Sequence, residues 1–419
     1  MPTNQLYVPS RFAEAPINAH GNCRLQRIGD FERADNESGI VSKQPAEFDT
    51  EGYSVFTGLD ENKLREITTD LHNIGIKVEG QSSSDWQLPL YALTNSEHGD
   101  LETVRGIFAS HLNEHSAWPY LESIVQECIN YAEIQRRIEL HGLENDPSNP
   151  FIKVMGMGII HTHLDELAVS LRMEELDGYS DLDKYIQGIM GDSSPFADQP
   201  QKYLAMEKLF DSLAEAFEFC AKLGVSHRDL KPSNIMVSAD GKVKIVDLAT
   251  AHFNGKPSVR LAKAGTNNYI PPEFFASFNV EDGLERLTKE ELISEIITLQ
   301  AGLDYAKFDT FSMAMGVMQM LGGDVPHNRG DLSGGDRKVA LQNALDKDLY
   351  LRECFRMMTG FTESAILGLH NMLNQQDSHT IAMVEILTRG CTYSTQDRTH
   401  SPAQLCKEIA WAFASFNTV

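Results

Sequence analysis

The sequence predicts an α+β fold in two parts, a small strand-rich lobe with helical insertions followed by a large helical lobe. Short apolar and β-branched runs bounded by turn residues crowd the first part, whereas apolar residues at spacings of three and four dominate the last part. A turn follows a strand candidate near Glu174–Asp181 and marks the boundary. We therefore predict a flexible leader over residues 1–20, a divergent strand-rich lobe over 21–176 and a helical lobe over 177–419.

Individual elements follow from local patterns. Helical spacing covers residues 60–73, 100–115 and 120–142 in the first lobe. The clearest helices, residues 180–190 and 201–224, lie in the second lobe, and the longer of them stops at a glycine. Strands are predicted for residues 74–80, 87–94, 149–161 and 166–176.

The composition is that of an ordinary globular protein, since 42% of the 419 residues are hydrophobic and 23% are charged. The formal net charge of −24 repels phosphate backbones and anionic membranes, so we expect no nucleic-acid partner. The plainest reading of this acid excess is that it keeps the protein soluble. No apolar run approaches the length of a membrane span, and none is expected.

Six cysteines lie far apart and form no CxxC pair, which argues against a zinc site and against a compact disulfide framework. Reduced, mostly buried thiols in a reducing compartment are expected instead. The polar start carries no charged-then-apolar signal segment. These features predict a cytoplasmic protein, with export by a specialised machinery as the alternative.

Polar residues concentrate on one short turn in the segment VSHRDLKPSNIMVSADGKVKIVDLATA, Val225–Ala251. A strand, an ADG turn and a second strand follow this polar turn, so a hairpin is expected to bring Asp229 and Asn234 close to Asp247. An amide and a carboxylate oxygen suit Mg²⁺. A separate carboxylate can accept a hydroxyl proton, and Lys231 can offset charge on a transferring phosphoryl group. A lone Asp in a turn is usually an ordinary surface residue. The combination of Asp229, Lys231, Asn234 and Asp247 at these spacings instead predicts phosphoryl transfer.

The stretch HRDLKPSN resembles the catalytic loop of the eukaryotic-type protein kinases. The resemblance implies that Asp229 is the catalytic base or hydroxyl-orienting acid, Lys231 the phosphate-stabilising lysine and Asn234 a metal ligand. The triplet Asp-Leu-Ala that begins at Asp247 stands where the family has Asp-Phe-Gly, which implies that Asp247 is the principal Mg²⁺ ligand. The lysine two residues after the catalytic acid is similar to serine/threonine kinases, and the implied cofactors are ATP and Mg²⁺.

Further motifs follow in the order that the family has. GTNNYIPPE, Gly265–Glu273, resembles the end of a kinase activation segment. DTFSMAMG begins at Asp309 and is similar to the buried helix whose Asp anchors the catalytic loop. Arg398 stands in the position of the arginine that pairs with the activation-segment glutamate, here Glu273.

The hinge is implied by LRMEELDGYSDLDKYI. By resemblance, Met173 is the gatekeeper, and the residues from Glu174 to Leu176 face the adenine. The alternative is that this stripe of Met and Leu is plain core.

The nucleotide-pairing lysine and its acid partner remain open in the sequence. Lys43 has the better preceding turn, whereas Lys77 has the better strand context. Glu133 fits the acid that pairs with this lysine, with Glu127 and Glu139 as rivals. A glycine-rich loop of the family's form is absent from the sequence, and RIGDF at residues 27–31 is the nearest stretch.

Three expectations concern regulation. The insertion over residues 274–308 provides either extra core or a surface for an activating or scaffold partner. Ser258 is the better phosphosite candidate because Thr266 matches the family's structural threonine, and a phosphate there would pair with Arg228. Ala249 in place of glycine loses access to positive φ, which predicts a segment fixed in one state.

The leading function is therefore an ATP- and Mg²⁺-dependent serine/threonine protein kinase acting on a protein hydroxyl. The alternatives are a pseudokinase scaffold, an enzyme that transfers AMP and a kinase for a non-protein acceptor. The divergent small lobe resembles kinases that pathogenic bacteria deliver into host cells, which implies a host-protein substrate and a host cytosol location.

Overall fold

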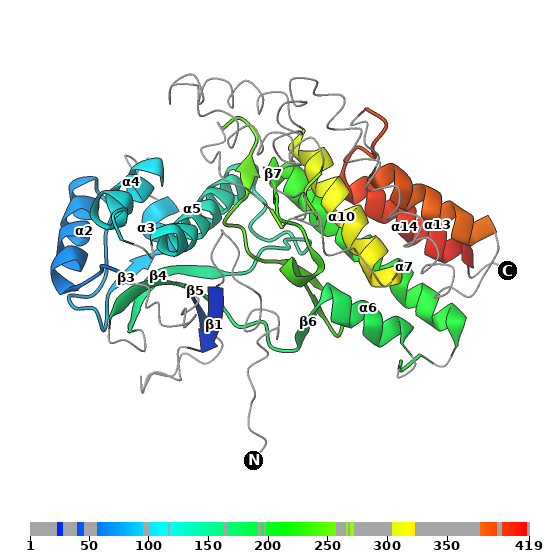
Figure 1. The fold of residues 1–419 in the computed structure, drawn as a ribbon, viewed down its shortest axis with the longest axis horizontal. Helices are drawn as coiled ribbons and strands as arrows, with labels where there is room; N and C mark the ends of the chain where they lie inside the picture. Colours follow the sequence, from blue (N-terminus) through cyan, green and yellow to red (C-terminus); the bar gives the residue numbers. More distant parts are fainter. Residues whose placement is uncertain are drawn as a thin grey trace, which may run out of the picture. The chain divides into compact units, whose positions relative to one another are not determined.

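A computed structural model of the 419-residue chain forms two units (Figure 1). The first comprises Met1–Ser180 with Ile245–Thr250, and the second comprises Asp181–Lys244 with Ala251–Val419. The structure describes residues 23–27, 40–45, 57–94, 101–115, 118–161, 166–191, 194–196, 198–256, 265–266, 269–271, 304–322, 378–391 and 396–416. The leader, residues 28–31, Ser258, the Pro272-Glu273 pair and residues 274–303 lie outside the described residues.

The first unit contains an antiparallel sheet in the order β1-β2-β5-β4-β3. Its strands are β1 (Cys23–Arg27), β2 (Ile40–Pro45), β3 (Gln87–Pro89), β4 (Val154–His161) and β5 (Leu167–Glu174). The central strand β5 is buried along most of its length, which explains its nearly continuous apolar run. Lys43 in β2 lies opposite Leu25 of β1 and Leu171 of β5, so its position is set by pairing on both sides.

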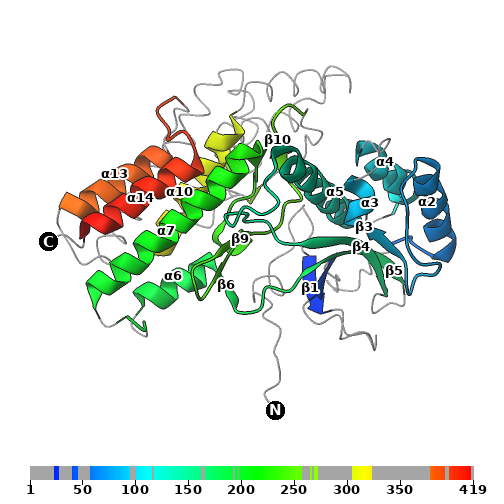
Figure 2. The same cartoon turned by 180° about the vertical axis from the view of Figure 1, so that it is seen from behind.

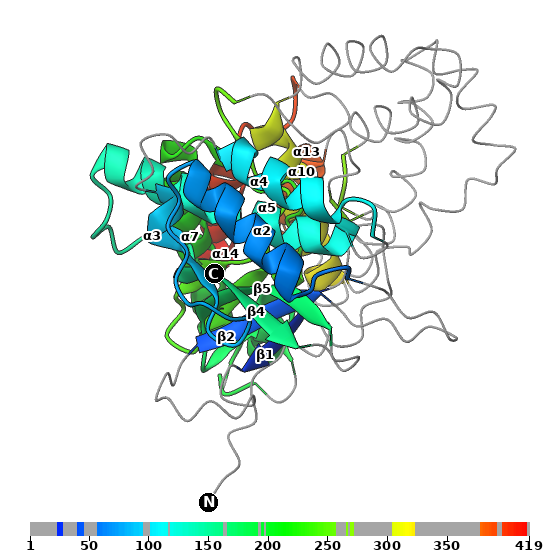
Figure 3. The ribbon, with the colours of Figure 1, turned by 90° about the vertical axis from the view of Figure 1, so that its left-hand side faces the viewer.

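Helices gather on one side of this sheet (Figure 3). They are α2 (Glu61–Asn73), α3 (Leu90–Thr94), α4 (Leu101–Leu112) and α5 (Trp118–His141). Asp60 begins α2 by accepting hydrogen bonds from the backbone N–H groups of Asn62 and Lys63. The long helix α5 packs against α3, α4 and β5, so most of its central turns have no solvent-facing side. The predicted helices of this lobe are thus present.

Two predicted strands of the first unit are wrong in part. Residues 74–80 form only an isolated bridge between Glu79 and Gln87, because glycines at both ends turn the chain at positive φ. Residues 87–94 begin as β3 but continue as α3 from Leu90 onward. An apolar run of this length does not distinguish a strand from a short buried helix.

The second unit is mainly helical (Figure 2). Its helices are α6 (Leu182–Met190), α7 (Gln199–Lys222), α10 (Tyr305–Gly322), α13 (Ser378–Gly390) and α14 (Pro402–Phe416). In α7, Asp198 caps the first turn, and apolar residues at spacings of three and four are buried against α14. The rings of Tyr203 and Phe416 lie 4.9 Å apart, and those of Phe210 and Phe413 lie 6.0 Å apart. The predicted helical lobe is confirmed.

Short strands precede α6 and follow α7. They are β6 (Tyr179–Asp181), β7 (Val225–Ser226), β8 (Ile235–Ser238), β9 (Val243–Ile245) and β10 (His252–Phe253), with the 3₁₀ helix η2 (Pro232–Asn234). β8 and β9 are neighbours in one sheet, and Gly241 turns the chain between them at a φ of 83°. This is the hairpin that the ADG turn predicts. In the described part of the chain, the helices are too short or too polar to cross a membrane.

Candidate catalytic site

The loop after α7 is anchored by a buried carboxylate. Asp309 on α10 accepts hydrogen bonds from the backbone N–H groups of His227 (2.6 Å) and Arg228 (2.8 Å). Arg228 has a φ of 66°, a conformation that costs free energy for a bulky side chain and persists only where the surroundings hold it. Its guanidinium lies over the ring of Tyr305, 5.1 Å from the centroid. Asp309 therefore binds the main chain of the loop, and Tyr305 contacts one of its side chains.

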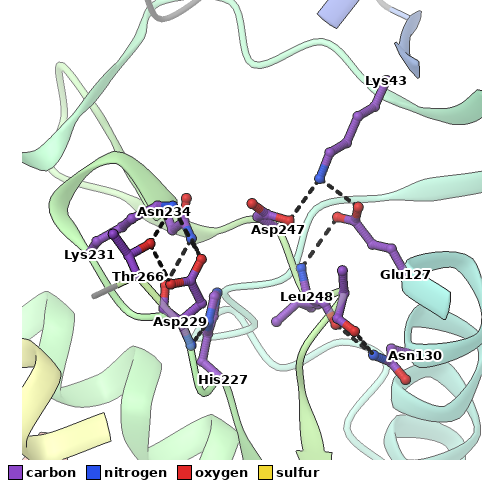
Figure 4. Close-up of polar contacts among 11 residues, drawn as sticks. Lys43, Glu127, Asn130, His227, Asp229, Lys231, Asn234, Asp247, Leu248 and Thr266 are labelled. Atoms are coloured by element: carbon purple, nitrogen blue, oxygen red, sulfur yellow. Dashed lines mark hydrogen bonds and ion pairs between the residues drawn. The ribbon is translucent and has the colours of Figure 1, made fainter. Parts of the chain in front are cut away.

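Asp229 follows this anchor and carries the central carboxylate of the loop (Figure 4). Its Oδ1 accepts a hydrogen bond from Thr266 Oγ1 at 2.8 Å, and its Oδ2 accepts one from Lys231 Nζ at 3.2 Å. Asn234 Nδ2 donates to the backbone oxygen of Asp229 at 2.9 Å. The structure thus brings together three of the residues that the sequence singles out in this loop.

Asn234 is fully buried and presents one unused acceptor. Its Nδ2 is engaged, but its Oδ1 has no hydrogen-bond partner among the described residues. Buried amide oxygens are nearly always satisfied, so an acceptor of this kind is open to a further partner. A neutral carbonyl-type oxygen is a ligand that a hard divalent cation accepts. The side chain therefore fits a metal ligand.

Asp309 also has a perturbed acidity. Burial raises its pKa to about 6, although the charge of His227 and the two backbone N–H donors oppose the shift. The carboxylate therefore changes its charge within the range of ordinary assay conditions.

Arg398 is also buried in the second unit. It donates from a terminal guanidinium nitrogen to the backbone oxygen of Lys307 at 3.1 Å, and its guanidinium lies 5.2 Å from the ring centroid of Phe311. Its expected partner, Glu273, lies outside the described residues.

The first unit holds a separate cluster of three ionisable side chains (Figure 4). Lys43 Nζ lies 2.6 Å from Glu127 Oε2 and 2.9 Å from Asp247 Oδ1. Lys43 and Glu127 are buried, whereas about a quarter of the Asp247 side chain is exposed. One ammonium is thus shared by two carboxylates from α5 and from the segment after β9.

This cluster shows which lysine and which glutamate of the sequence candidates form an ion pair. Lys43 joins it, whereas Lys77 is exposed on the turn after α2. The glutamate beside Lys43 is Glu127, and the prediction of Glu133 for this place is wrong. Glu133 lies about one and two-thirds turns further along α5, on a different face of the helix. It accepts a hydrogen bond there from Arg137 at 2.8 Å.

The residues expected at the gatekeeper and hinge positions lie at the end of β5 and just after it. Met173 is buried and paired with Val41 of β2. Glu174 accepts a hydrogen bond from the backbone N–H of Lys153 at 2.9 Å, and Leu176 is half-buried in the following turn. Their contact with adenine stays a prediction.

Replacing Lys43 by Met is expected to lower the free energy of unfolding at pH 8 by about 3–5 kcal/mol, because Glu127 becomes an uncompensated buried charge. Burial raises the pKa of Glu127 against the opposing effect of the Lys43 charge. Without that lysine, the native state retains a proton that the unfolded chain releases as the pH rises. The deficit should therefore shrink at pH 5.

Urea unfolding at pH 5 and pH 8 measures this difference. The matched control is Lys77→Met, an exposed lysine in the same unit, which should stay within about 0.5 kcal/mol of the native protein. An equal deficit of Lys43→Met at both pH values would contradict the account.

The fold and these side chains define a two-lobed, protein-kinase-like α+β protein. Residues 123–284 match the family model described as protein kinase domain, so this segment of the chain is similar to the protein kinases.

Curated relatives agree over short stretches. The chain is 37% identical over 71 residues to a probable serine/threonine-protein kinase, FMP48, of Saccharomyces cerevisiae, covering 17% of this chain and 19% of that protein. It is 29% identical over 128 residues to CBL-interacting protein kinase 30 of Oryza sativa subsp. japonica, covering 30% and 22%. It is 44% identical over 70 residues to sperm motility kinase 2B of Mus musculus, covering 16% and 14%. The chain thus spans less than a quarter of the length of each.

One residue that contacts the Asp247 segment is absent from the set that the sequence suggests. Asn130 lies on α5 one turn after Glu127, and its side chain is buried against the backbone of Leu248 and Ala249. The only local signal is an amide within the apolar stretch that surrounds it, and such an amide must find a hydrogen-bond partner.

Proposed function

We propose that the protein is an ATP- and Mg²⁺-dependent serine/threonine protein kinase. The observation that carries the proposal is the hydrogen bonding of Asp229, whose carboxylate is held by Lys231 and Thr266 on a loop anchored through its backbone. The match to the protein kinase domain model supports phosphotransferase activity. The name of the Saccharomyces cerevisiae relative, a probable serine/threonine-protein kinase, supports serine/threonine specificity.

In this proposal Asp229 orients the hydroxyl of a substrate Ser or Thr and accepts its proton. Lys231 places a positive charge beside the phosphoryl group during transfer. Thr266 keeps the carboxylate in one orientation, since its hydroxyl donates to one oxygen while the lysine contacts the other. Catalysis is then mostly positioning and charge stabilisation, as is usual for phosphoryl transfer.

Lys43 is the nucleotide-pairing lysine in this proposal. Glu127 and Asp247 hold its ammonium in a buried position, so that it can bind nucleotide phosphates as a preorganised cation. Met173, together with the residues from Glu174 to Leu176, would line the adenine site.

Asn234 and Asp247 are the proposed Mg²⁺ ligands, and the ion would supply positive charge that offsets the charge of the transferring phosphoryl group. The orphaned amide oxygen of Asn234 supports its part in this role. Asp247 supplies a partly exposed carboxylate.

The substrate in this proposal is a protein that presents a Ser or Thr hydroxyl. An activating or scaffold partner would bind through residues 274–308. We place the protein in the cytoplasm, with delivery into the cytosol of a host cell as the alternative that its divergent small lobe suggests.

Label transfer tests this function. The purified protein is incubated with Mg²⁺, a generic Ser/Thr protein substrate and ATP labelled at the γ-phosphate, and a parallel sample carries the label at the α-phosphate. We expect only the γ label to reach the substrate, and Asp229→Asn to abolish the transfer. Transfer of the α label would indicate nucleotidyl transfer instead. ATP binding without any transfer, in the presence of varied protein and non-protein acceptors, would favour a scaffold.

A further inference from the structure

The side chain of Asn130 donates hydrogen bonds to the backbone of the segment that follows Asp247. Its Nδ2 donates to the backbone oxygen of Leu248 at 2.6 Å and to that of Ala249 at 3.3 Å. Its Oδ1 accepts a hydrogen bond from Gln126 Nε2 at 3.0 Å. Because the amide oxygen is engaged by Gln126, the amide nitrogen is directed toward the two carbonyl groups (Figure 4).

Helix α5 also contacts the backbone N–H group of Leu248. The backbone N–H of Leu248 donates to Glu127 Oε1 at 3.3 Å, while the second oxygen of that carboxylate contacts Lys43. The donor and the acceptor of Leu248 are therefore both bound by side chains one turn apart on α5. The side chain of Leu248 is also fully buried, so both its backbone groups and its side chain are packed or hydrogen-bonded.

The backbone just before Leu248 needs this support. Asp247 has a φ of 64°, in the left-handed region that non-glycine residues seldom adopt. Such a conformation costs free energy and persists only where surrounding contacts over-determine it. Ala249 is not in that region, since Arg228 and Asp247 are the non-glycine residues with positive φ in the described part of the chain. The strain therefore falls on the residue that contacts Lys43.

An amide at position 130 is not needed to fill space. Among its neighbours on α5, Ile129, Ala132 and Ile134 are apolar and buried, so a branched aliphatic side chain would suit this part of the surroundings. A buried amide is destabilising unless it is hydrogen-bonded, and the donors of Asn130 are matched by carbonyl groups of the segment after β9.

We propose that Asn130 is a positioning residue that fixes the backbone of Leu248 and Ala249, and thereby holds Asp247 in the orientation in which it contacts Lys43. The effect on catalysis rests on the proposed function, but the fixing of the segment does not. In this assignment, the hydrogen bonds of Asn130 offset the free-energy cost of the left-handed conformation of Asp247.

Hydrogen–deuterium exchange of the 419-residue chain tests the proposal without ATP. Asn130→Leu keeps the branched shape of the side chain and removes the donors, and the exchange of a peptide covering residues 245–251 is measured. We expect this peptide to exchange about 10-fold faster, which corresponds to about 1.4 kcal/mol, because two buried carbonyl groups lose their hydrogen-bond donor. Gln135→Leu, which replaces a half-buried amide on the same helix, is the matched control and should leave the peptide unchanged.

A milder variant covers the case in which Asn130→Leu does not fold. Gln126→Leu leaves Asn130 in place but releases its amide oxygen, and it should speed the exchange of the same peptide about threefold, in line with the loss of a weaker indirect contact. Unchanged exchange in the folded variants would overturn the proposal.

Activity supplies the second measurement. For Asn130→Leu we expect kcat to fall about 10-fold, with the KM for the protein substrate unchanged, because a misplaced Asp247 affects phosphoryl transfer and not substrate binding. Faster exchange with an unchanged kcat would overturn the catalytic part of the proposal. If the native protein transfers no phosphate but Asn130→Leu still exchanges faster, the positioning stands and the proposed function fails.

Discussion

Replacing Asp229 by Asn is expected to lower kcat for phosphoryl transfer by about 10²–10⁴-fold, the usual contribution of a positioned general base. The amide keeps the size of the side chain and an oxygen that can accept from Lys231 or Thr266, so the loop should retain its conformation. An amide cannot take a proton from a substrate hydroxyl. The loss should therefore appear in kcat and leave the thermal unfolding midpoint within a few degrees.

Asp211→Asn provides the matched control, because Asp211 is an exposed aspartate on α7 in the same unit. It should retain full activity. Steady-state kinetics under saturating ATP compares the two variants. Full activity of Asp229→Asn would contradict the proposed role of Asp229, whereas equal losses in both variants would point to a general effect of charge.

Replacing Asp309 by Ala is expected to lower the free energy of unfolding by about 2–4 kcal/mol and to reduce kcat as well. The substitution leaves two buried backbone N–H donors, those of His227 and Arg228, without their acceptor, at about 1–3 kcal/mol each. The desolvation of the carboxylate is no longer incurred, which offsets part of this loss. The loop that carries Asp229 should lose its fixed conformation.

The control lies on the same helix. Asp304 caps α10 by accepting from the backbone N–H groups of Ala306 and Lys307, so Asp304→Ala should cost about 1 kcal/mol and leave kcat unchanged. Denaturant unfolding and kinetics separate the two cases. Equal effects of the two substitutions would show that Asp309 acts only through the stability of the helix.

The pKa of Asp309 makes the contribution of this residue depend on pH. Its pKa is raised by burial from 3.8 to about 6, so between these values the native state binds a proton that the unfolded chain has released. The stabilising contribution is complete below pH 3.8 and is lost as the pH rises through 6. Asp309→Asn should remove this part of the decline between pH 4 and pH 7, as measured by urea unfolding.

Much of the fold follows from local patterns. Spacings of three and four residues predict α5 and α7 because a helix repeats every 3.6 residues, and each helix buries one or more faces. The polar loop could also be predicted from local sequence. Asp229, Lys231 and Asn234 lie within a few residues of one another, and their contacts depend on one short turn. The strand prediction for residues 74–80 is wrong because a run of this length between glycines has no periodicity that distinguishes a strand from a turn.

The partners of the ionisable side chains in the first unit were decided only by the tertiary structure. The sequence by itself left Lys43 and Lys77 level as the lysine of one ion pair, and it favoured Glu133 over Glu127 and Glu139 as the acid. Lys43 and Glu127 meet because β2 pairs with β5 and α5 packs on that strand, which orients one face of the helix toward the lysine. The same packing brings Asn130 to Leu248. Local periodicity encodes which face of an element is buried, whereas the choice of partner across distant segments depends on how those faces pack.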